Sequence, residues 1–284
     1  MIRNRVEQLG IGLSFKERHP KLKDTPDSRF PQRAALVPDK NRTTAMGMGL
    51  PSIEGYSLGT KRALIIFDEY ADAPIKSLFV WTSSIDNLLK RKRMEKYAIA
   101  RNVGAGLMSR RDNFKATNRK FTHVGSKDPS LVPQPLLNIF SRLEEETYEN
   151  TGQEIQLGFA YGEGDHRVRS SQRFALFVAQ LIRENPYMTD EQIETLVTED
   201  FIKSFYDVGG NWTNVHLLLR TYYNADAIKS PQGNFFKFHL SEIGEVHGPK
   251  TAVYAVPTPF PLLGFDDIDS AILDYATTER PEGK

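Results

Sequence analysis

The sequence predicts an α+β fold: a hairpin-containing antiparallel or mixed sheet, several amphipathic helices and an extended N-terminal arm. Prolines and glycines crowd the first 60 residues, where they interrupt long helices and strands. Two apolar runs on either side of a polar segment then suggest a hairpin, and later apolar residues recur at helical spacing. Because strand-like and helix-like segments come in blocks and not in strict alternation, the pattern favours α+β over α/β.

Residues 1–60 are predicted to form an extended basic arm. Up to Met46 they contain ten lysine and arginine residues against five acidic ones, and five prolines lie between positions 20 and 51. Apolar side chains such as Phe15 and Phe30 favour an arm that packs on the body or on a neighbouring subunit over a disordered tail. Residues 61–284 are then predicted to form a single α+β body.

A hairpin is predicted at the start of this body, where "RALIIF" and "IKSLFVW" flank "DEYADAP". An apolar run that ends in Asp68 and Glu69 also resembles the strand that presents a magnesium carboxylate in nucleotide-hydrolysing enzymes. A phosphate-binding loop is missing, however, because in "GYSLGTKR" Gly59 is followed by Thr60 before Lys61, and no helix fits before the apolar run. ATP or GTP hydrolysis is therefore disfavoured, and the two acids are predicted to lie in the turn.

Further helices and strands are predicted along the body. Ser84 can cap a helix whose apolar stripe begins at Ile85 and which ends before Gly104. The other expected elements are a helix between Pro135 and Gly152, a strand "EIQLGFAY", a helix over 171–184, a helix that begins with the capping box of Thr189 and Gln192, a helix "TNVHLLLRTYY", strands "NFFKFHL" and "KTAVYAV", and a last helix capped by Asp266 or Asp267.

The composition excludes several classes of site. Cysteine is absent, which excludes disulfides, thiolate nucleophiles and cysteine-ligated metals. The longest apolar runs fall well short of the roughly 20 residues that span a bilayer, and no signal-peptide pattern is present. We therefore expect no membrane partner, and a location in the cytoplasm or in an intracellularly assembled particle.

Metal and catalytic motifs are also missing. The six histidines show neither His-x-His nor His-Glu-x-x-His spacing, and no Gly-x-Ser-x-Gly string occurs, so no metal site, cofactor or catalytic residue is predicted. One loop, "GEGDHRV", gathers Glu163, Asp165 and His166, but Val168 stands where a facial triad needs a carboxylate. A charged surface loop is the simpler interpretation of this segment.

The basic segment 90–127 is the most unusual feature of the sequence. It holds twelve lysine and arginine residues against two acidic ones in a protein whose net charge is +1. Clusters of this kind bind phosphate backbones, and interleaved aromatic residues can stack on bases. The predicted nucleic-acid-binding residues are Lys90, Arg91, Lys92, Arg93, Lys96, Arg101, Arg110, Arg111, Lys115, Arg119 and Lys120. The alternative is an exposed basic face, or an interface to the acidic region around Glu144 of another copy.

Two functional hypotheses follow from these patterns. The preferred one is a non-catalytic subunit of a larger assembly, such as a viral or phage structural protein or a nucleoprotein subunit. Its arm would contact other copies of the chain or other assembly subunits, and its basic segment would contact an RNA or DNA backbone. The alternative is an enzyme with a site built from scattered loops around Glu163, Asp165 and His166, because catalytic groups converge in space and not in sequence.

Overall fold

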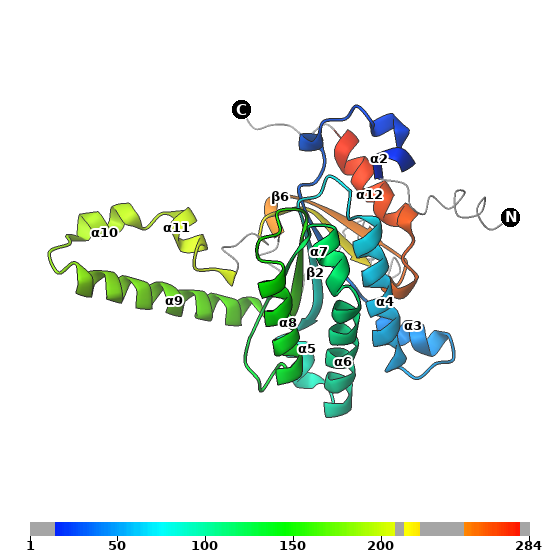
Figure 1. The fold of residues 1–284 in the computed structure, drawn as a ribbon, viewed down its shortest axis with the longest axis horizontal. Coiled ribbons are helices and arrows are strands. Elements are labelled where there is room, and N and C mark those ends of the chain that lie inside the picture. Colours follow the sequence, from blue (N-terminus) through cyan, green and yellow to red (C-terminus); the bar gives the residue numbers. More distant parts are fainter. Residues whose placement is uncertain (1–14, 208–212, 222–246, 279–284) are drawn as a thin grey trace, which may run out of the picture.

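The computed structural model describes residues 15–207, 213–221 and 247–278, and a six-stranded sheet forms its centre (Figure 1). Every strand pairing among these residues is parallel, in the order β3-β4-β2-β1-β5-β6. The strands are β1 (Arg33–Val37), β2 (Ser77–Ser84), β3 (Lys120–Val124), β4 (Glu154–Tyr161), β5 (Val215–Thr221) and β6 (His247–Val256). A parallel sheet requires a crossover between successive strands, so the fold class is α/β.

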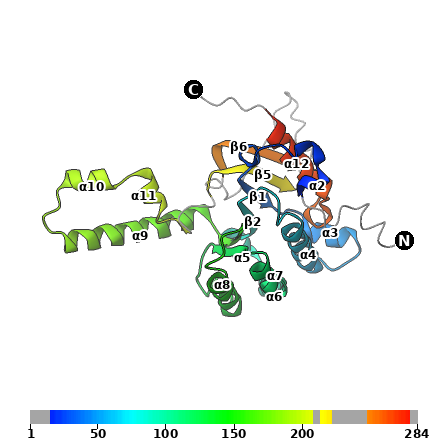
Figure 2. The ribbon, with the colours of Figure 1, turned by 45° about the horizontal axis from the view of Figure 1, so that its top comes forward.

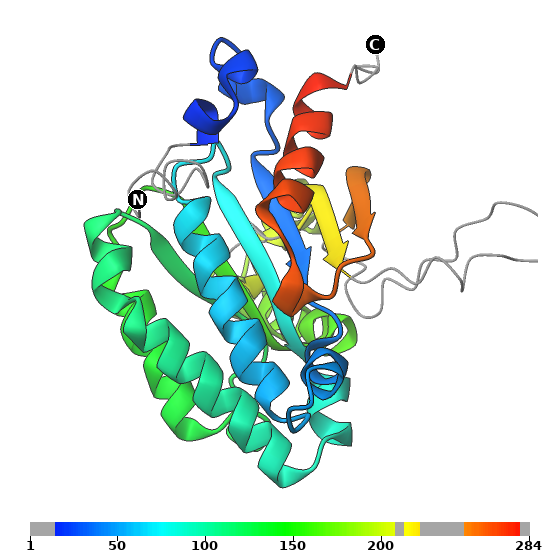
Figure 3. The ribbon, with the colours of Figure 1, turned by 90° about the vertical axis from the view of Figure 1, so that its right-hand side faces the viewer.

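Helices connect the strands and cover the sheet. The described helices are α2 (Phe15–Arg18), α3 (Asn41–Gly47), α4 (Glu54–Glu69), α5 (Ile85–Lys90), α6 (Arg93–Ser109), α7 (Arg111–Ala116), α8 (Gln134–Glu146), α9 (Glu163–Glu184), α10 (Asp190–Leu196), α11 (Glu199–Lys203) and α12 (Phe265–Thr277), with 3-10 turns η1 (Pro20–Leu22), η2 (Asp27–Arg29) and η5 (Phe260–Leu262). Figure 3 shows α4, α6 and α8 side by side on one face of the sheet. None of the described helices is long and apolar enough to cross a membrane.

The larger hydrophobic core lies between the sheet and the layer that contains α4, α6, α8 and α12. Side chains such as Leu36, Val80 and Leu157 pack from the sheet against Phe67, and Ile272 completes the core on the α12 side. A smaller cluster on the opposite face includes Phe79 and Trp81 from β2. The central strands are therefore buried on both faces, which explains why their sequences are continuous runs of apolar residues.

The predicted hairpin sheet is wrong because the first of its two apolar runs is helical. "ALIIF" belongs to α4, which begins at Glu54 and buries Leu64 and Phe67. Only the second run forms a strand, β2, and it pairs in parallel with β1 and β4. "TNVHLLLRTYY" shows the opposite error, since it contains β5 and not a helix. Periodicity cannot distinguish a short buried strand from a buried helical segment, so both errors have the same physical origin.

The extended N-terminal arm is also wrong. Strand β1 lies near the middle of the sheet, between β2 and β5. Upstream of it, Phe15 is fully buried and its ring packs near those of Phe30 and Tyr70, with centroids 6.0 and 6.3 Å away. The domain boundary expected after residue 60 falls inside α4. Of the prolines that suggested an arm, Pro20 is the first residue of η1 and the other four lie between elements, where proline does not interrupt a helix or a strand.

Several predicted elements are confirmed. The Ser84 hydroxyl caps α5 by accepting a hydrogen bond from the Asn87 backbone N–H, and Thr189 caps α10 in the same way. "EIQLGFAY" forms β4 and "KTAVYAV" lies in β6. The last helix forms as α12, but its N-cap is Gly264, and Asp267 contributes by accepting a hydrogen bond from the Gly264 backbone N–H. The predicted strand "NFFKFHL" lies outside the described residues. Gly104 does not end a helix, because α6 continues through it to Ser109.

Helices α9, α10 and α11 project from the body as an arm (Figures 1 and 2). The sequence predicted a helix over 171–184, but α9 begins at Glu163, so that its first turns remain on the body. Farther out, α10 and α11 fold back along α9. The phenylalanine rings of α9 pack edge-to-face or tilted against Phe201 and Phe205 there, with centroids 5.4 to 6.2 Å apart.

Candidate active site

The topology of the sheet places a crevice at the carboxyl ends of β1 and β5. The chain leaves β1 toward β2 on one side and leaves β5 toward β6 on the other. In open α/β sheets, ligands bind where the direction of the connections reverses in this way. A polar pocket of about 310 Å³ lies at the same edge of the sheet, beside the ends of β1 and β2. Its lining residues are Pro38, Asp39, Lys40, Asn41, Arg42, Thr43, Tyr56, Trp81, Thr82, Ser83, Asn87, Arg91 and Ile99.

Asp39 is held at the centre of this edge by three hydrogen bonds. Its backbone N–H donates to the Thr221 hydroxyl at 2.9 Å, and its carbonyl accepts from the Phe260 N–H at 3.1 Å. Its carboxylate accepts from Nε of Arg220 at 3.0 Å. Asp39 thus receives contacts from β5 and η5 although it follows β1, and the contact to its side chain comes from Arg220 on β5. Burial raises the pKa of Asp39, and the nearby Arg220 guanidinium only partly offsets that effect.

The segment after Asp39 turns sharply into α3. Lys40 adopts a left-handed conformation with φ of 69°, which is uncommon for a side chain of this size. Asn41 then lies against α4, where a Cβ on Gly55 would be 2.2 Å from its carbonyl oxygen and a Cβ on Gly59 would be 2.5 Å from its Oδ1. The two glycines of "GYSLGTKR" therefore allow α3 to approach α4, and they do not form a phosphate loop.

A charged network closes the side of the pocket formed by α4, α5 and α6. Arg91 donates a hydrogen bond to the Tyr56 hydroxyl and lies 5.2 Å from the centre of its ring. Glu95 accepts from Arg42 at 3.1 Å and lies 3.4 Å from the Tyr56 hydroxyl. Burial raises the pKa of Tyr56, so it remains a neutral hydrogen-bonding group at physiological pH. Two arginines are thereby positioned at the pocket.

Three buried polar atoms that belong to pocket-lining residues have no hydrogen-bond partner in the described part of the chain. They are Asn41 Oδ1, Trp81 Nε1 and Ser83 Oγ. A buried polar group without a partner costs about 1–3 kcal/mol, and native proteins retain few of them. Their position beside Lys40, Arg42 and Arg91 indicates a polar, anionic ligand that would satisfy these groups.

An apolar cavity of about 70 Å³ continues from the polar pocket between α4, α6 and the sheet. The two spaces share Pro38, Asn41, Tyr56, Thr82 and Ile99. Deeper in, the cavity is lined by aliphatic and aromatic side chains: Ala63, Leu64, Phe67, Val80, Val103, Leu107, Leu157 and Phe260. A pocket lined by cations that adjoins an apolar cavity suits an amphipathic ligand with an anionic head and a hydrocarbon tail.

The residues of the predicted basic segment are spread over α5, α6, α7 and β3. Arg91 lines the polar pocket, Arg110 pairs with Asp68 at 2.9 Å, and Arg119 is buried. Lys90 pairs with Asp86, and both Arg111 and Lys115 pair with Glu146. Lys120 lies over the ring of Tyr148. In the described residues, Lys92, Arg93, Lys96 and Arg101 have no ion pair. Nucleic-acid binding by this segment stays a prediction.

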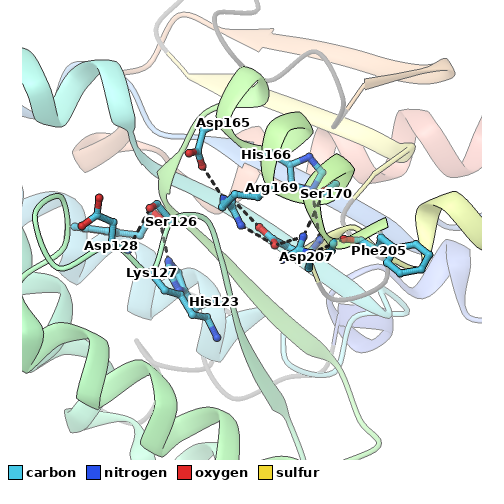
Figure 4. Close-up of polar contacts among 12 residues, drawn as sticks. His123, Ser126, Lys127, Asp128, Asp165, His166, Arg169, Ser170, Phe205 and Asp207 are labelled. Carbon is cyan, nitrogen blue, oxygen red and sulfur yellow. Dashed lines mark hydrogen bonds and ion pairs between the residues drawn. The ribbon is translucent and has the colours of Figure 1, made fainter. Parts of the chain in front are cut away.

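The loop residues of the enzyme hypothesis do not line the polar pocket. Glu163, Asp165 and His166 form the first turn of α9, and Figure 4 shows Arg169 between Asp165 and Asp207. Arg169 binds Asp165 at 2.7 Å and Asp207 at 2.9 Å. His166 is fully buried, and its Nε2 lies 3.3 Å from the Ser170 hydroxyl. These contacts anchor the base of α9 and give no group that could act on a ligand in the polar pocket.

Sequence reasoning missed Asp39, Asn41 and Arg42 because residues 1–60 were interpreted as an arm. One signal could have identified them. "RAALV" is a short apolar run followed at once by Pro38 and charged residues, which is the pattern of a buried parallel strand that ends at a ligand site. Arg220 follows a second such run, "HLLL", that periodicity assigned to a helix.

The chain resembles known prenyl diphosphate enzymes in sequence and fold. It is 23% identical over 202 residues to the tritrans,polycis-undecaprenyl-diphosphate synthase (geranylgeranyl-diphosphate specific) of Archaeoglobus fulgidus, across 70% of this chain and 76% of that protein. It is 25% identical over 170 residues to cis-prenyltransferase 4, chloroplastic, of Solanum lycopersicum, across 58% of this chain and 54% of that protein. The crystal structure of lavandulyl diphosphate synthase from Lavandula x intermedia in complex with dimethylallyl diphosphate has a TM-score of 0.69 and 23% identity, and the match covers 89% of this chain and 98% of that one.

These similar proteins are enzymes, and the prediction of a non-catalytic viral, phage or nucleoprotein subunit is therefore wrong. The alternative hypothesis, an enzyme, is supported as a class, and its site in the loop at Glu163 stays a prediction. The family model described as "Putative undecaprenyl diphosphate synthase" matches residues 37–283, from the last residue of β1 onward. The chain belongs to this prenyltransferase family.

Proposed function

We propose that this protein joins two prenyl diphosphates and releases one diphosphate. In the donor, the bond between the allylic carbon and the diphosphate oxygen breaks, and its electron pair leaves with the diphosphate. A carbon–carbon bond forms to the double bond of the acceptor, which then loses a proton. The acceptor keeps its own diphosphate, in agreement with the product names of the diphosphate synthases that the chain resembles.

One observation carries this proposal: the polar pocket with its unsatisfied buried groups adjoins the apolar cavity between α4 and α6. Lys40, Arg42 and Arg91 supply positive charge where a diphosphate would lie. Trp81 Nε1 and Ser83 Oγ would donate hydrogen bonds to its oxygens. The hydrocarbon would enter the cavity beyond Ile99, which excludes water from the reacting carbons.

Asp39 is the one carboxylate among the residues that line the polar pocket. A carboxylate beside a diphosphate is repulsive unless a cation lies between them, and Mg²⁺ is commonly bound by one or two carboxylates together with substrate phosphates. Asp39 therefore fits the ligand of a Mg²⁺ that arrives with the diphosphate. Such an ion would neutralise the charge that develops on the leaving group.

The test is to replace Asp39 by Asn, which keeps the size and the backbone contacts but removes the charge. With geranylgeranyl diphosphate as donor and dimethylallyl diphosphate or its five-carbon isomer as acceptor, we expect kcat/KM to fall at least about 100-fold. Mass spectrometry would follow the longer prenyl diphosphate, and a coupled assay would follow the released diphosphate.

Asp112→Asn is the matched control, because Asp112 is an exposed acid on α7 outside the pocket. Its activity is expected to equal that of the wild-type protein within about twofold. Wild-type protein that forms no longer prenyl diphosphate with either acceptor, or equal activity in Asp39→Asn and the control, would contradict the proposed function.

A further inference from the structure

An exposed surface that combines basic and apolar side chains borders the mouth of the polar pocket. We call it the basic-apolar face and define it by Leu89, Lys92, Arg93, Met94, Lys96 and Tyr97. It covers the end of α5 and the first turns of α6, at the lower end of the molecule in Figure 1. Leu89, Met94 and Tyr97 are 60%, 70% and 62% exposed, which is unusual for side chains of this size on adjacent turns.

The cations of this face lack partners in the described part of the chain. Lys92, Arg93 and Lys96 form no ion pair there, in contrast to Lys90, which pairs with Asp86. An open groove of about 660 Å³ runs beside them between α6 and residues 129–133, and Met94, Tyr97, Leu131 and two prolines contribute to its walls. Four residues of the basic-apolar face, two basic and two apolar, thus line one groove: Arg93, Met94, Lys96 and Tyr97.

The face is continuous with the pocket that takes the diphosphate. Asn87 and Arg91 line the pocket from α5 and from the residue after it, and Lys92 comes next in the chain. On the other side of the pocket, Met46, Met48 and Leu50 are 55%, 48% and 41% exposed in and after α3. Exposed apolar side chains therefore flank the opening from two elements.

We propose that the basic-apolar face docks the protein onto the surface of an anionic lipid bilayer. Clusters of lysine and arginine on a helix attract anionic headgroups, and aromatic and aliphatic side chains beside them insert at the boundary with the acyl chains. A phosphate backbone would use the cations but would leave Leu89 and Met94 in water, so the combination favours a bilayer over nucleic acid. A role of this docking in the delivery of an amphipathic substrate or product rests on the proposed function, whereas the docking itself does not.

Within the described part of the chain, the absence of a helix that could span a membrane is compatible with this surface contact, because docking requires only that side chains enter the interface. The expectation of no membrane partner was based on the length of apolar runs, and that criterion detects only spanning segments.

The test is co-sedimentation of the full chain with vesicles of phosphatidylcholine alone or with 30% phosphatidylglycerol added, at about 0.1 M salt. We expect binding to the anionic vesicles only, with weaker binding at higher salt. The variant Lys92→Gln/Arg93→Gln/Lys96→Gln should lower the partition coefficient at least about tenfold. The variant Met94→Ser/Tyr97→Ser should lower it at least about fivefold.

Two control variants remove the same chemistry elsewhere. Lys23→Gln/Lys61→Gln/Lys76→Gln removes three exposed lysines, and Ile65→Ser/Tyr148→Ser removes one exposed aliphatic and one exposed tyrosine side chain. Both should bind vesicles within about twofold of the wild-type protein. Circular dichroism would verify that all variants fold, and transfer between water-soluble short prenyl diphosphates should be unchanged in the two face variants.

Three results would overturn the docking proposal. The first is wild-type protein that does not bind anionic vesicles, and the second is equal loss in the face and control variants. The third is wild-type protein that binds duplex DNA, or forms dimers through this face, and does not co-sediment with vesicles. Vesicle binding without any transferase activity would leave docking intact and would instead contradict the proposed function.

Discussion

At the residue scale, burial changes the acid–base chemistry of two side chains in different ways. Asp39 is partly buried at the pocket, and burial raises its pKa. Because Asp39 must be ionised to hold a cation, activity should fall as the pH decreases, and this fall should occur at a higher pH than it would with an ordinary carboxylate.

His123 lies in the core on β3, where its ring stacks on Phe140 with centroids 4.4 Å apart. Its Nε2 donates to the Phe159 carbonyl at 2.9 Å, which leaves Nδ1 without a partner in the described residues.

His123 should make the protein sensitive to acid. Burial lowers its pKa from an ordinary value of 6.5 to about 4. Between those values the unfolded chain binds the proton and the folded protein does not, so stability should fall as pH decreases through this range, by up to about 3 kcal/mol. Chemical denaturation at pH 7 and pH 4 would measure this loss. His123→Phe keeps the stacking and should reduce the loss, whereas parallel pH profiles for the two proteins would contradict the assignment.

At the element scale, the cavity depends on how closely α4 and α6 approach each other. Gly106 on α6 makes this approach possible, because a Cβ there would lie 2.6 Å from Cγ2 of Thr60 on α4. Thr60 and its neighbour Leu64 both line the apolar cavity. The space for a hydrocarbon therefore depends on this close approach of α4 to α6, and side chains of the sheet such as Val80 and Leu157 complete its walls.

Gly106→Ala should destabilise the protein although alanine favours a helix over glycine by about 1 kcal/mol. The clash with Thr60 should cost about 1–3 kcal/mol and push the two helices apart. Thr60→Ser removes the opposing methyl group, so the double variant should recover stability relative to Gly106→Ala. A double-mutant cycle of unfolding free energies would measure this coupling, and additive effects would show that the two residues do not touch.

At the scale of the whole molecule, the arm of α9, α10 and α11 has few contacts with the body. Leu176, Phe177 and Ile182 on α9 are 68%, 40% and 45% exposed. Beyond Ser170, α9 contains no buried side chain. Apart from the contacts of Phe174 and Phe177 with Phe201 and Phe205, this part of α9 has little apolar packing within its own chain, and most helical stability in proteins comes from such packing.

The sequence predicted self-association through residues 1–60; we instead predict that self-association uses α9, α10 and α11. Light scattering after size exclusion should give about twice the mass of 32.2 kDa for the wild-type protein. Leu176→Ser/Ile182→Ser should shift the mass toward that of one chain, because the exposed apolar surface would no longer favour burial. Ile65→Ser/Tyr148→Ser is the control and should leave the mass unchanged. A wild-type monomer, or equal shifts in both variants, would contradict this role.

Much of the local structure could be predicted from the residues alone. Capping residues such as Ser84 and Thr189 mark helix starts, because a side-chain oxygen must satisfy a free backbone N–H. Runs such as "SLFVW" and "EIQLGFAY" were identified as strands from their β-branched and aromatic content. The runs "ALIIF" and "HLLL" were assigned wrongly, since a buried helix and a buried strand both require apolar residues throughout.

By itself, the sequence determined what kinds of chemistry are available. Without cysteine, and without histidine motifs, the site had to be built from carboxylate, arginine, lysine, amide and hydroxyl groups. Only the tertiary structure decided which of these groups meet. Asp39, Trp81 and Arg220 are far apart in sequence, and the parallel sheet brings them to one edge because its strands all end on the same side. The site thus depends on the order of the strands, which no local pattern of residues encodes.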